Sequence, residues 1–319
     1  MINIIGGSGF IGSRLSSKYF RNGVEHKVLD IKESENQSNY VFADVTDIET
    51  LRNNIQEESL IINLAAEHKD NIKPISKYYD VNVKGAKNVC EIAEEKQIKK
   101  IIFTSSVAVY GFADQETDES GHINPFNDYG KSKFEAEKIY MQWQKKDKEN
   151  RTLIIIRPTV VFGENNRGNV FNLLYQINSR NFFKIGSGNN KKSIAYVDNV
   201  VDFIDFCLKI EKNITISNYI DKPDLSMNEL VDHTKNLLGY KNKLNISIPY
   251  YVAILIGMFF DLLSFLTRKE FSISMIRIKK FCSSTTFTSN KEDIGFKPKI
   301  DIYEGLKKTI THEFIKQID

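Results

Sequence analysis

Short apolar runs alternate with helix-like segments along the first half of the chain. Five runs have the length of a strand and are largely apolar throughout, without alternating polar positions: residues 2–5, 27–29, 60–64, 100–103 and 153–156. Strands that are covered by helices on both faces show this pattern. The sequence therefore predicts an α/β protein built on a doubly wound parallel sheet.

The apolar pattern loosens after residue 162. Polar stretches rich in glycine and asparagine follow at 163–169 and 186–190. A chain of 319 residues can bury a large core in two lobes that share a cleft. We expect residues 1–162, together with roughly 191–212, to form the domain around the sheet. We expect residues 163–190 and 213–319 to form a smaller C-terminal lobe that binds the substrate.

The first apolar run leads into a turn with glycine at every third position, Gly6, Gly9 and Gly12. Glycine permits a tight turn and lets the backbone amides at a helix N-terminus approach a pyrophosphate, because no Cβ stands in the way. Ordinary turns also use glycine, but these glycines lie between a strand and a helix, as in Rossmann-type nucleotide-binding domains. We therefore expect a dinucleotide here. The other residues of the turn that we assign to it are Ser8, Phe10 and Ile11.

An acidic residue ends the second predicted strand. Asp30 follows Gly12 by 18 residues, where a carboxylate accepts hydrogen bonds from the hydroxyls of the adenosine ribose. The same carboxylate would repel a 2′-phosphate, so this position favours NAD over NADP. The alternative is that Asp30 is an ordinary loop carboxylate.

Two further segments at strand ends are candidates for the wall of the cofactor site. Asp44 and Val45 follow a third short strand, where they would hold the adenine. Leu64, Ala65 and Ala66 end the next strand, and small side chains there leave room for a ligand where the strand order reverses. Taken alone, each segment is equally compatible with plain packing.

A tyrosine and a lysine stand four residues apart, at Tyr129 and Lys133, on one face of a predicted helix. A free phenol titrates near ~10, but two positive neighbours, the lysine and an oxidised nicotinamide, favour the phenolate by roughly one to three pKa units each. Tyr129 would then exchange a hydroxyl proton near neutral pH. A serine in the hydroxyl-rich strand end at 104–106 would hydrogen-bond the same oxygen. This tyrosine–lysine spacing also occurs on surface helices, so its combination with the glycine turn and Asp30 carries the assignment.

With these residues, the chain resembles the extended short-chain dehydrogenase/reductase family, which contains NAD-dependent sugar epimerases and dehydratases. The resemblance implies that Ser106, Tyr129 and Lys133 are catalytic, because Ser106 stands four residues before Tyr110 as the serine of the family does. It also implies that the segment from Arg157 to Thr159 passes the nicotinamide. The cofactor contacts implied in this way are Asn82, Tyr129, Lys133, Pro158 and Thr159.

Dehydratases of this family carry an Asp-Glu pair directly after the catalytic hydroxyl residue, to expel water. Val107 and Ala108 stand at those positions here, and neither side chain can exchange a proton. The resemblance therefore favours epimerisation over dehydration. It implies a tightly bound NAD that is reduced and reoxidised within each cycle and is not consumed.

Five longer stretches resemble a narrower group, the bacterial 4-epimerases that interconvert N-acetylglucosamine and N-acetylgalactosamine on undecaprenyl diphosphate for O-antigen and lipopolysaccharide synthesis. These stretches are residues 64–70, 167–173, 193–197, 219–225 and 278–282. Two departures from nucleotide-sugar epimerases agree with this resemblance. Val160 replaces an asparagine, and Lys192 replaces an arginine that holds the diphosphate, so the charge is kept without a bidentate fork.

The narrower resemblance also implies which residues contact the substrate. They are Glu67, His68, Ser106, Val107, Arg167, Asn169 and Lys192, of which Arg167, Asn169 and Lys192 are assigned to the diphosphate. His68 has the alternative of a polar loop residue without a ligand. The family resemblance further implies a homodimer.

The bulk properties exclude some classes of partner. The net charge of +3, from 44 basic and 41 acidic residues, gives no field that favours nucleic acid. The three cysteines are an odd number without metal-ligand spacing, so we expect reduced thiols and no metal site. Met1 leads directly into a strand without a signal-peptide pattern, so we expect a cytoplasmic protein.

Residues 249–266 are highly apolar and are interrupted by Asp261. Basic residues follow up to position 280: Arg268, Lys269, Arg277, Lys279 and Lys280. The uncharged part is shorter than the ~20 residues of a membrane-spanning helix, so we do not expect it to span a bilayer. It fits a helix on the cytoplasmic membrane surface, with basic residues toward anionic headgroups. It fits a buried core or dimer helix equally well.

These features predict an NAD-dependent sugar 4-epimerase, most closely one that acts on the lipid-linked sugar. Two alternatives within enzymology are a 4-epimerase of UDP-N-acetylglucosamine or UDP-glucose and a reductase of a 4-keto-sugar nucleotide. A third alternative is a non-catalytic protein that senses NAD and binds a partner protein. An intact set of Ser106, Tyr129 and Lys133 argues against the sensor, which has no need of all three.

Overall fold

The computed structural model describes residues 1–33, 39–69, 72–113, 115–211, 213–240, 247–268, 271 and 274–315. Asp70 of the stretch 64–70 and Lys269 of the basic group lie outside these residues, as do parts of the predicted C-terminal lobe, among them 241–246 and 316–319.

Seven parallel strands form the main sheet, in the order β3-β2-β1-β4-β5-β6-β10. Its strands are β1 (Ile2–Ile5), β2 (His26–Asp30), β3 (Tyr40–Phe42), β4 (Leu60–Asn63), β5 (Lys100–Thr104), β6 (Thr152–Pro158) and β10 (Ile214–Tyr219). All five runs predicted from the sequence are strands, with bounds within two residues of those expected. The order reverses between β1 and β4, which confirms the doubly wound sheet.

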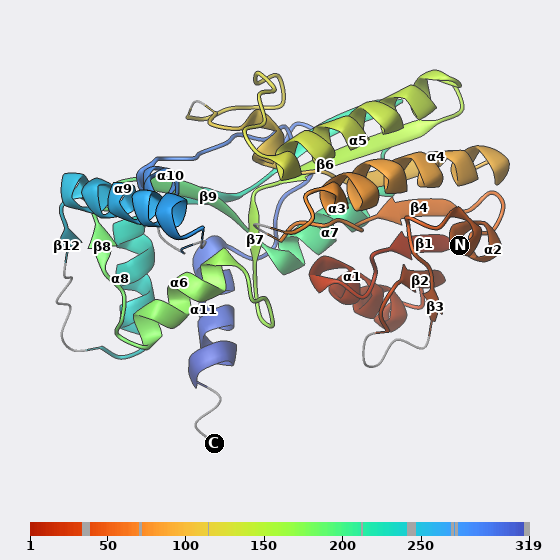
Figure 1. Cartoon of the computed structure of the whole chain (residues 1–319). Coiled ribbons are helices and arrows are strands. Elements are labelled where there is room, and N and C mark those ends of the chain that lie inside the picture. Colours follow the sequence, from red (N-terminus) through yellow and green to blue (C-terminus); the bar gives the residue numbers. More distant parts are fainter. Residues whose placement is uncertain are drawn as a thin grey trace.

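Helices cover both faces of this sheet (Figure 1). One face carries α2 (Ile48–Asn54), α4 (Gly85–Glu95) and α5 (Asp128–Lys145), and the other carries α1 (Phe10–Arg21) and α7 (Val197–Cys207). Neighbouring residues of one strand point to opposite faces, so Ile101 joins the first core and Ile102 joins the second. Both positions must be apolar, which is why the strands are apolar runs.

β10 lies in a segment that the sequence assigned to the C-terminal lobe. It pairs with β6 over its whole length, from Ile214 beside Leu153 to Tyr219 beside Pro158. The apolar pattern missed this strand because it carries polar residues that are buried in hydrogen bonds. Asn218, for example, is fully buried and accepts a hydrogen bond from the Tyr110 hydroxyl at 2.9 Å. The main sheet therefore continues past the expected boundary at residue 212.

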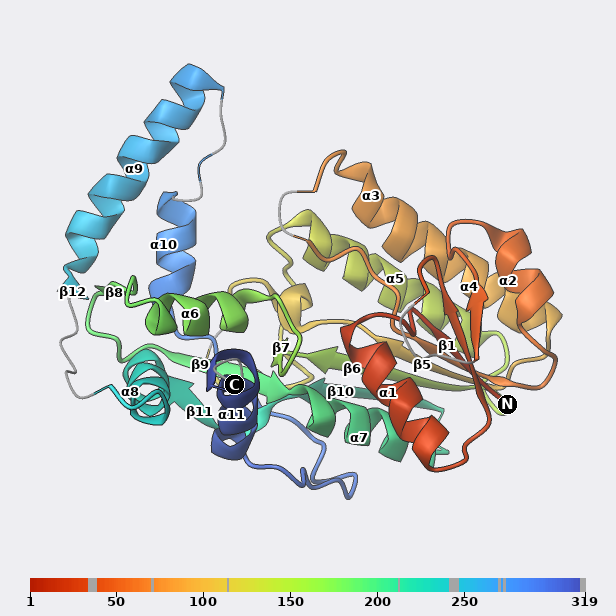
Figure 2. The same cartoon turned by 90° about the horizontal axis from the view of Figure 1, so that it is seen from below.

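A second group of elements packs beside the carboxyl end of the sheet (Figure 2). The strands β7 (Val160–Phe162), β9 (Lys191–Tyr196) and β11 (Asp221–Ser226) form a small sheet. The helices α6 (Asn169–Asn178), α8 (Met227–Leu237) and α11 (Ile302–Ile310) share a separate apolar core with it. The remaining described elements are α3 (Ser76–Tyr78), the π-helical turn η1 (Tyr79–Lys84), the 3₁₀ turn η2 (Val107–Tyr110), β8 (Lys184–Ile185), β12 (Ser247–Ile248), α9 (Tyr250–Thr267), α10 (Met275–Cys282) and the π-helical turn η3 (Thr311–Ile315).

α9 projects from this second group and is accompanied by α10 (Figure 2). Only 11% of α9 is buried, so the alternative of a core helix within one chain is wrong, while a dimer helix stays a prediction. Its 18 residues correspond to about 27 Å of helix, against a hydrocarbon core of ~30 Å. By length and composition alone α9 is able to cross a membrane. The length of α9 therefore does not support our expectation that this segment is too short to span a bilayer.

Candidate active site

The cofactor residues predicted from the sequence stand in a row along the carboxyl edge of the main sheet. In the order of the strands, the row comprises Asp44 after β3, Asp30 at the end of β2, the glycine turn after β1, Leu64 to Ala66 after β4, Ser106 after β5, and Pro158 with Thr159 at the end of β6. Ligands of open α/β sheets bind at this edge, at the point where the strand order reverses. That point lies beside the glycine turn.

The glycine turn is fixed by close backbone contacts. Gly6 has a φ of +75°, and a Cβ on it would stand 2.5 Å from the Ala65 nitrogen. A Cβ on Gly12 would stand 2.5 Å from the Gly6 oxygen, so the first turn of α1 lies directly on the loop. Gly9, the N-cap residue of α1, differs: such a Cβ would have only the Gly6 oxygen within 4 Å, at 3.2 Å. Chain neighbours and the helix's own backbone apart, the described residues thus leave the Cβ side of Gly9 open.

Other members of the row hold the backbone of the edge in place. Asp30 accepts a hydrogen bond from the Ser8 amide at 3.0 Å, which joins the end of β2 to the glycine turn. Asp44 accepts hydrogen bonds from the amide and the hydroxyl of Thr46, both at 2.8 Å. Val45 is buried against the helix that begins at Gly85. Val45 therefore has a packing role, whatever it does for a cofactor.

Phe10 and Ile11 begin α1 and pack into the core of the second group of elements. Arg14, one turn further along α1, donates hydrogen bonds to Glu164 at 2.9 Å and Asp198 at 2.8 Å. The helix that starts at the glycine turn therefore contacts the second group directly.

Tyr129 and Lys133 lie on the first turns of α5. Asn127 caps this helix by accepting a hydrogen bond from the Gly130 amide at 2.9 Å. Lys133 is 1% exposed and lies 4.3 Å from the centre of the Phe103 ring. Burial lowers the pKa of Lys133 to about 7, although the nearby Glu137 carboxylate raises it. Its ammonium makes no hydrogen bond or ion pair with the residues that the structure describes.

Ser106 stands beside the start of α5. Its side chain caps the 3₁₀ turn η2 by accepting a hydrogen bond from the Ala108 amide at 3.1 Å. A Cβ on Gly130 would lie 2.5 Å from the Ala108 oxygen, so α5 packs tightly against η2 next to Tyr129. Val107, in the same turn, is half-buried and apolar. Ser106 and Tyr129 are thus carried by two segments in direct contact.

Asn82 connects two parts of the site. It lies in the π-helical turn η1, a distortion that is frequent at functional sites. Its side chain exchanges hydrogen bonds with the Glu67 backbone, at 2.9 and 3.1 Å, and donates to the Ser132 hydroxyl at 2.9 Å. Ser132 directly precedes Lys133. The Glu67 side chain itself accepts the amides of His68 and Lys69, and His68 is exposed.

A buried ion pair behind the site was not predicted. Arg157 donates to both carboxylate oxygens of Glu137, at 2.9 and 2.6 Å, and to the Tyr110 hydroxyl at 2.7 Å. Both charged side chains are almost fully buried, and Glu137 raises the pKa of Arg157. The side chain of Arg157 therefore clamps β6 to α5, one turn beyond Lys133. In the sequence, the one local sign of a carboxylate behind the site was Glu137, four residues after Lys133 and on the same face of the predicted helix.

The residues assigned to the diphosphate are not joined in one cluster. Arg167 is exposed and pairs with Glu313 of η3 at 2.9 Å, while Asn169 begins α6 and is also exposed. Lys192 lies on β9, and its ammonium donates to the Lys280 oxygen of α10 at 2.9 Å. Within the described parts of the chain, no hydrogen bond or ion pair links Arg167 to Lys192.

Two features of the carboxyl edge fit NAD. The free space at Gly9 lies at a helix N-terminus, where backbone amides and the helix dipole favour a pyrophosphate. The unpaired, buried ammonium of Lys133 is a donor for ribose hydroxyls. Both features offer donors that a bound NAD would use.

No group of three or more metal-binding side chains exists among the described residues. All three cysteines are free thiols; Cys90 and Cys207 are buried and Cys282 is half-buried. Burial raises the pKa of the Cys282 thiol, so the thiolate is disfavoured.

A model of the NAD-dependent epimerase/dehydratase family matches residues 2–218. The chain belongs to this family, and NAD is its cofactor. Membership confirms the resemblance that the glycine turn, Asp30 and the tyrosine–lysine pair indicated.

Proteins of known activity are similar over the whole chain. The N-acetyl-α-D-glucosaminyl-diphospho-ditrans,octacis-undecaprenol 4-epimerase of Escherichia coli O157:H7 is 42% identical, over 98% of this chain and 95% of that protein. The UDP-glucose 4-epimerase of Vibrio cholerae is 26% identical, over 97% and 94%. Among solved structures, the UDP-glucose 4-epimerase of Thermotoga maritima with UDP-glucose has a TM-score of 0.77 at 20% identity, covering 100% of this chain and 99% of that one. This structural likeness shows the fold alone.

Proposed function

We propose that this enzyme interconverts N-acetylglucosamine and N-acetylgalactosamine on undecaprenyl diphosphate by inverting C4 of the sugar. The identity of 42% with the E. coli enzyme, over almost the full length of both chains, carries this proposal. The order of Ser106, Tyr129 and Lys133 along the carboxyl edge supports it, because these groups provide what a 4-epimerisation needs.

The mechanism begins with a proton. Tyr129, as the phenolate, removes the proton from the sugar O4, and the Ser106 hydroxyl bridges the two oxygens. The ammonium of Lys133 stabilises the phenolate and holds the nicotinamide ribose. A bound NAD would supply the hydride acceptor and donor for C4. The flat 4-keto sugar turns over in the site before Tyr129 returns the proton, so C4 is inverted.

The turn after Ser106 supports epimerisation over dehydration. Val107 and Ala108 are the first residues of η2, next to the proposed proton-transfer groups. Neither can act as an acid or base, so the 4-keto sugar would meet no group there that expels water. Val107 instead offers an apolar wall to the sugar.

We propose a division of labour between the two parts of the chain. The main sheet and its helices hold NAD, and the group from residue 163 to 190 and beyond β10 holds the sugar diphosphate. Arg167 and Asn169 belong to this second group, and Lys192 joins them from β9 of the small sheet. Glu67 and His68 would contact the sugar from the main sheet, on the loop after β4. A homodimer is part of the proposal, and the mass in solution by light scattering decides it.

We further propose that α9 and α10 rest on the cytoplasmic face of a membrane. Large apolar side chains of α9 are exposed, with Tyr251 and Phe265 each 81% accessible, and basic residues stand at the junction with α10. Apolar side chains with nearby lysine and arginine match an anionic lipid surface. This contact would bring the active site to a lipid-borne sugar.

The packing of α9 against α10 favours a surface position over a spanning one. Asp261 accepts a hydrogen bond from the Met275 amide at 3.0 Å, and a Cβ on Gly257 would stand 2.8 Å from the Met275 backbone. A spanning α9 would draw Asp261 and the basic α10 into the hydrocarbon region, which is costly for charged groups.

The function is tested with membranes that carry undecaprenyl-diphosphate-linked N-acetylglucosamine. We expect purified protein to convert part of the sugar to N-acetylgalactosamine, measured after mild acid release, without added NAD. Parallel reactions contain UDP-N-acetylglucosamine and UDP-glucose. Conversion of a UDP-sugar alone would replace the proposal with the soluble epimerase that the UDP-glucose 4-epimerase relatives favour. Stoichiometric NADH consumption with a 4-keto-sugar nucleotide would identify a reductase, and NAD binding without any turnover would identify a sensor.

The membrane contact is tested by flotation with vesicles that contain anionic lipid. We expect wild-type protein to float and the double variant Arg268→Glu/Arg277→Glu to stay in the soluble fraction. The control Lys145→Glu/Lys148→Glu changes the charge equally at the far end of α5 and should float like wild type. Equal flotation of both variants would contradict the assignment of α9 and α10.

A further inference from the structure

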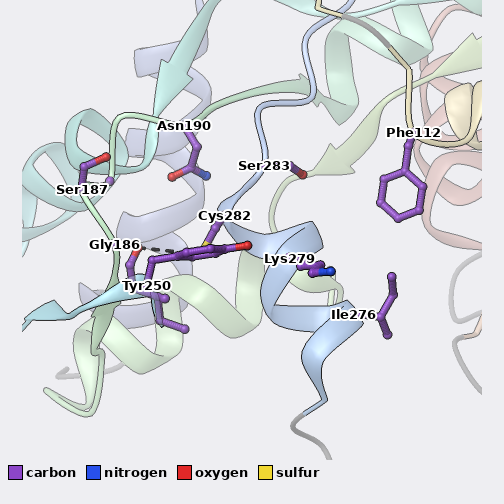
Figure 3. Close-up of a pocket in the computed structure, with 11 residues that line it drawn as sticks. Phe112, Gly186, Ser187, Asn190, Tyr250, Ile276, Lys279, Cys282 and Ser283 are labelled. Carbon is purple, nitrogen blue, oxygen red and sulfur yellow. Dashed lines mark hydrogen bonds between the residues drawn. The ribbon is translucent and has the colours of Figure 1, made fainter. Parts of the chain in front are cut away.

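A cavity of about 630 Å³ opens between α10, the loop after β8 and the start of α9 (Figure 3). Its volume is typical of a pocket for a small ligand. Phe112 and Ile276 face it on one side, and Tyr250 faces it on the other, with Lys279 between them. The wall is mainly apolar, and Lys279 is the charged side chain of the lining among the described residues.

Phe112 connects the cavity to the segments that carry the proposed catalytic groups. Its lining residue Phe112 follows η2, the turn that Ser106 caps, and its ring stands 4.7 Å from that of Phe126. Phe126 precedes Tyr129 by three residues, and the ammonium of Lys280 lies 5.1 Å from the centre of its ring. The start of α5, η2 and α10 therefore meet at this end of the cavity.

Three lysines stand at or beside the cavity: Lys279 lines it, and the Lys192 ammonium donates a hydrogen bond to the carbonyl of Lys280, the residue after Lys279. Lys192, Lys279 and Lys280 have no carboxylate partner among the described residues. Burial, together with the charge of Lys280, lowers the pKa of Lys192 to about 8. Cations that repel one another without a counter-ion favour an anion between them.

The opposite end of the cavity leads to the exposed apolar helix. Tyr250 lines the cavity and is the first residue of α9. Across from Tyr250, on the Phe112 side, Ile276 lines the cavity from α10 and is 50% exposed, so the apolar lining reaches the outside there too. The cavity thus extends from Phe112, beside the start of α5, past Lys279 to the first residue of α9.

We propose that this cavity binds the first isoprene units of a polyprenyl diphosphate, with the diphosphate at the lysines and the lipid chain leaving along α9. This inference rests on the proposed function and names the path of the lipid. An apolar wall beside the lysines suits an isoprenoid, because burying hydrocarbon there is favourable. A nucleoside in the same place would have to bury its polar ribose and base edges against Phe112 and Ile276.

The test measures binding and does not depend on turnover. NAD-loaded protein is titrated by calorimetry with geranyl diphosphate and, separately, with inorganic diphosphate. We expect wild type to bind geranyl diphosphate at least about tenfold more tightly, because only this probe buries hydrocarbon. Ile276→Asp should abolish the difference in affinity between the two probes. Because Ile276 is half exposed, the substitution should not destabilise the fold. Ile214→Asp is the matched control, on a residue 36% exposed at the amino end of β10, and should keep the difference.

A second pair of variants tests the role of the lysines. Lys192→Ala should weaken both probes by about tenfold, because each loses a charge-assisted contact. Lys191→Ala removes the same charge from the neighbouring, exposed position of β9 and should leave both affinities unchanged. Equal affinity of wild type for the two probes, or a preference that survives Ile276→Asp, would overturn the inference. If the preference behaves as expected but the lipid-linked sugar is not epimerised, the proposed function falls and the lipid path stands.

Discussion

The carboxyl edge of the main sheet and the pair α9–α10 use apolar residues in opposite ways. At the sheet, residues such as Ile101 and Ile102 are buried on both faces, and the glycine turn leaves no room for a Cβ at Gly6 or Gly12. On α9, most large apolar side chains face outward. Internal packing dictates residue type in the first region. In the second region the proposed membrane contact would account for the residue type.

The largest expected effect is on catalysis at the carboxyl edge. Tyr129→Phe removes the proposed acid–base group and should lower kcat for 4-epimerisation by about 10³-fold, within the usual range for such a group. Thermal unfolding should stay the same, because Tyr129 is only half-buried. The control Tyr79→Phe removes a nearby phenol that donates to Asp128 at 2.9 Å, and it should retain activity. Full activity of Tyr129→Phe would end the proposed mechanism.

The next effect is on stability, at the ion pair behind α5. Arg157→Met leaves the buried Glu137 carboxylate without its partner, which should cost about 3–5 kcal/mol in the free energy of unfolding measured with urea. Arg52→Met breaks ion pairs with Glu95 and Glu49 on the surface and should cost much less. An equal loss of unfolding free energy in the two variants would show that the burial of the Arg157–Glu137 pair does not determine its contribution to stability.

Much of the sheet edge was predictable because its determinants are local. A strand covered on both faces must be an apolar run, and residues that follow such runs meet at one edge, which places Asp30 and Ser106 in the same row. Family membership confirms the cofactor, while the individual residue roles remain predictions.

The rest was not predictable because its determinants are distant in sequence. The partner of Glu137 lies 20 residues away on another element, and β10 buries polar residues such as Asn218 in long-range hydrogen bonds. An apolar helix has the same sequence pattern in a core and on a membrane surface, so the exposure of α9 required the structure.

A smaller effect is expected at the glycine turn, where substitutions at Gly12 and Gly9 should act on different properties. Gly12→Ala places a Cβ 2.5 Å from the Gly6 oxygen and should cost about 1–3 kcal/mol of unfolding free energy. Gly9→Ala meets only one atom at 3.2 Å and should leave stability unchanged, yet weaken NAD binding by calorimetry, because the methyl group occupies the pyrophosphate space. If Gly9→Ala bound NAD with unchanged affinity, the pyrophosphate would not bind at Gly9.

Lys133 should leave a signature in the pH dependence of stability. Its pKa is about 7 in the folded protein, against 10.5 for an ordinary lysine. Between these values the unfolded chain binds the proton and the folded protein does not, so this group makes stability rise with pH, by at most ~1.4 kcal/mol per pH unit. Urea unfolding of NAD-free protein should show this rise, and Lys133→Met should lose it. Lys138→Met, at an exposed position of the same helix, should keep it; parallel curves for wild type and Lys133→Met would refute the assignment.

The smallest expected effect is on α9, where a large apolar residue should contribute almost nothing to folding. Phe265 is 81% exposed, so Phe265→Ser should change the free energy of unfolding by no more than about 0.5 kcal/mol. Ile154→Ala in the core of the sheet should cost about 2–5 kcal/mol, because it leaves a cavity among fully buried neighbours. The same Phe265→Ser protein should bind anionic vesicles more weakly in the flotation assay, since it lacks a side chain that would enter the lipid. If Phe265→Ser instead destabilised the isolated protein as much as Ile154→Ala does, α9 would be packed against protein in solution, and a second copy of the chain would be the partner to look for.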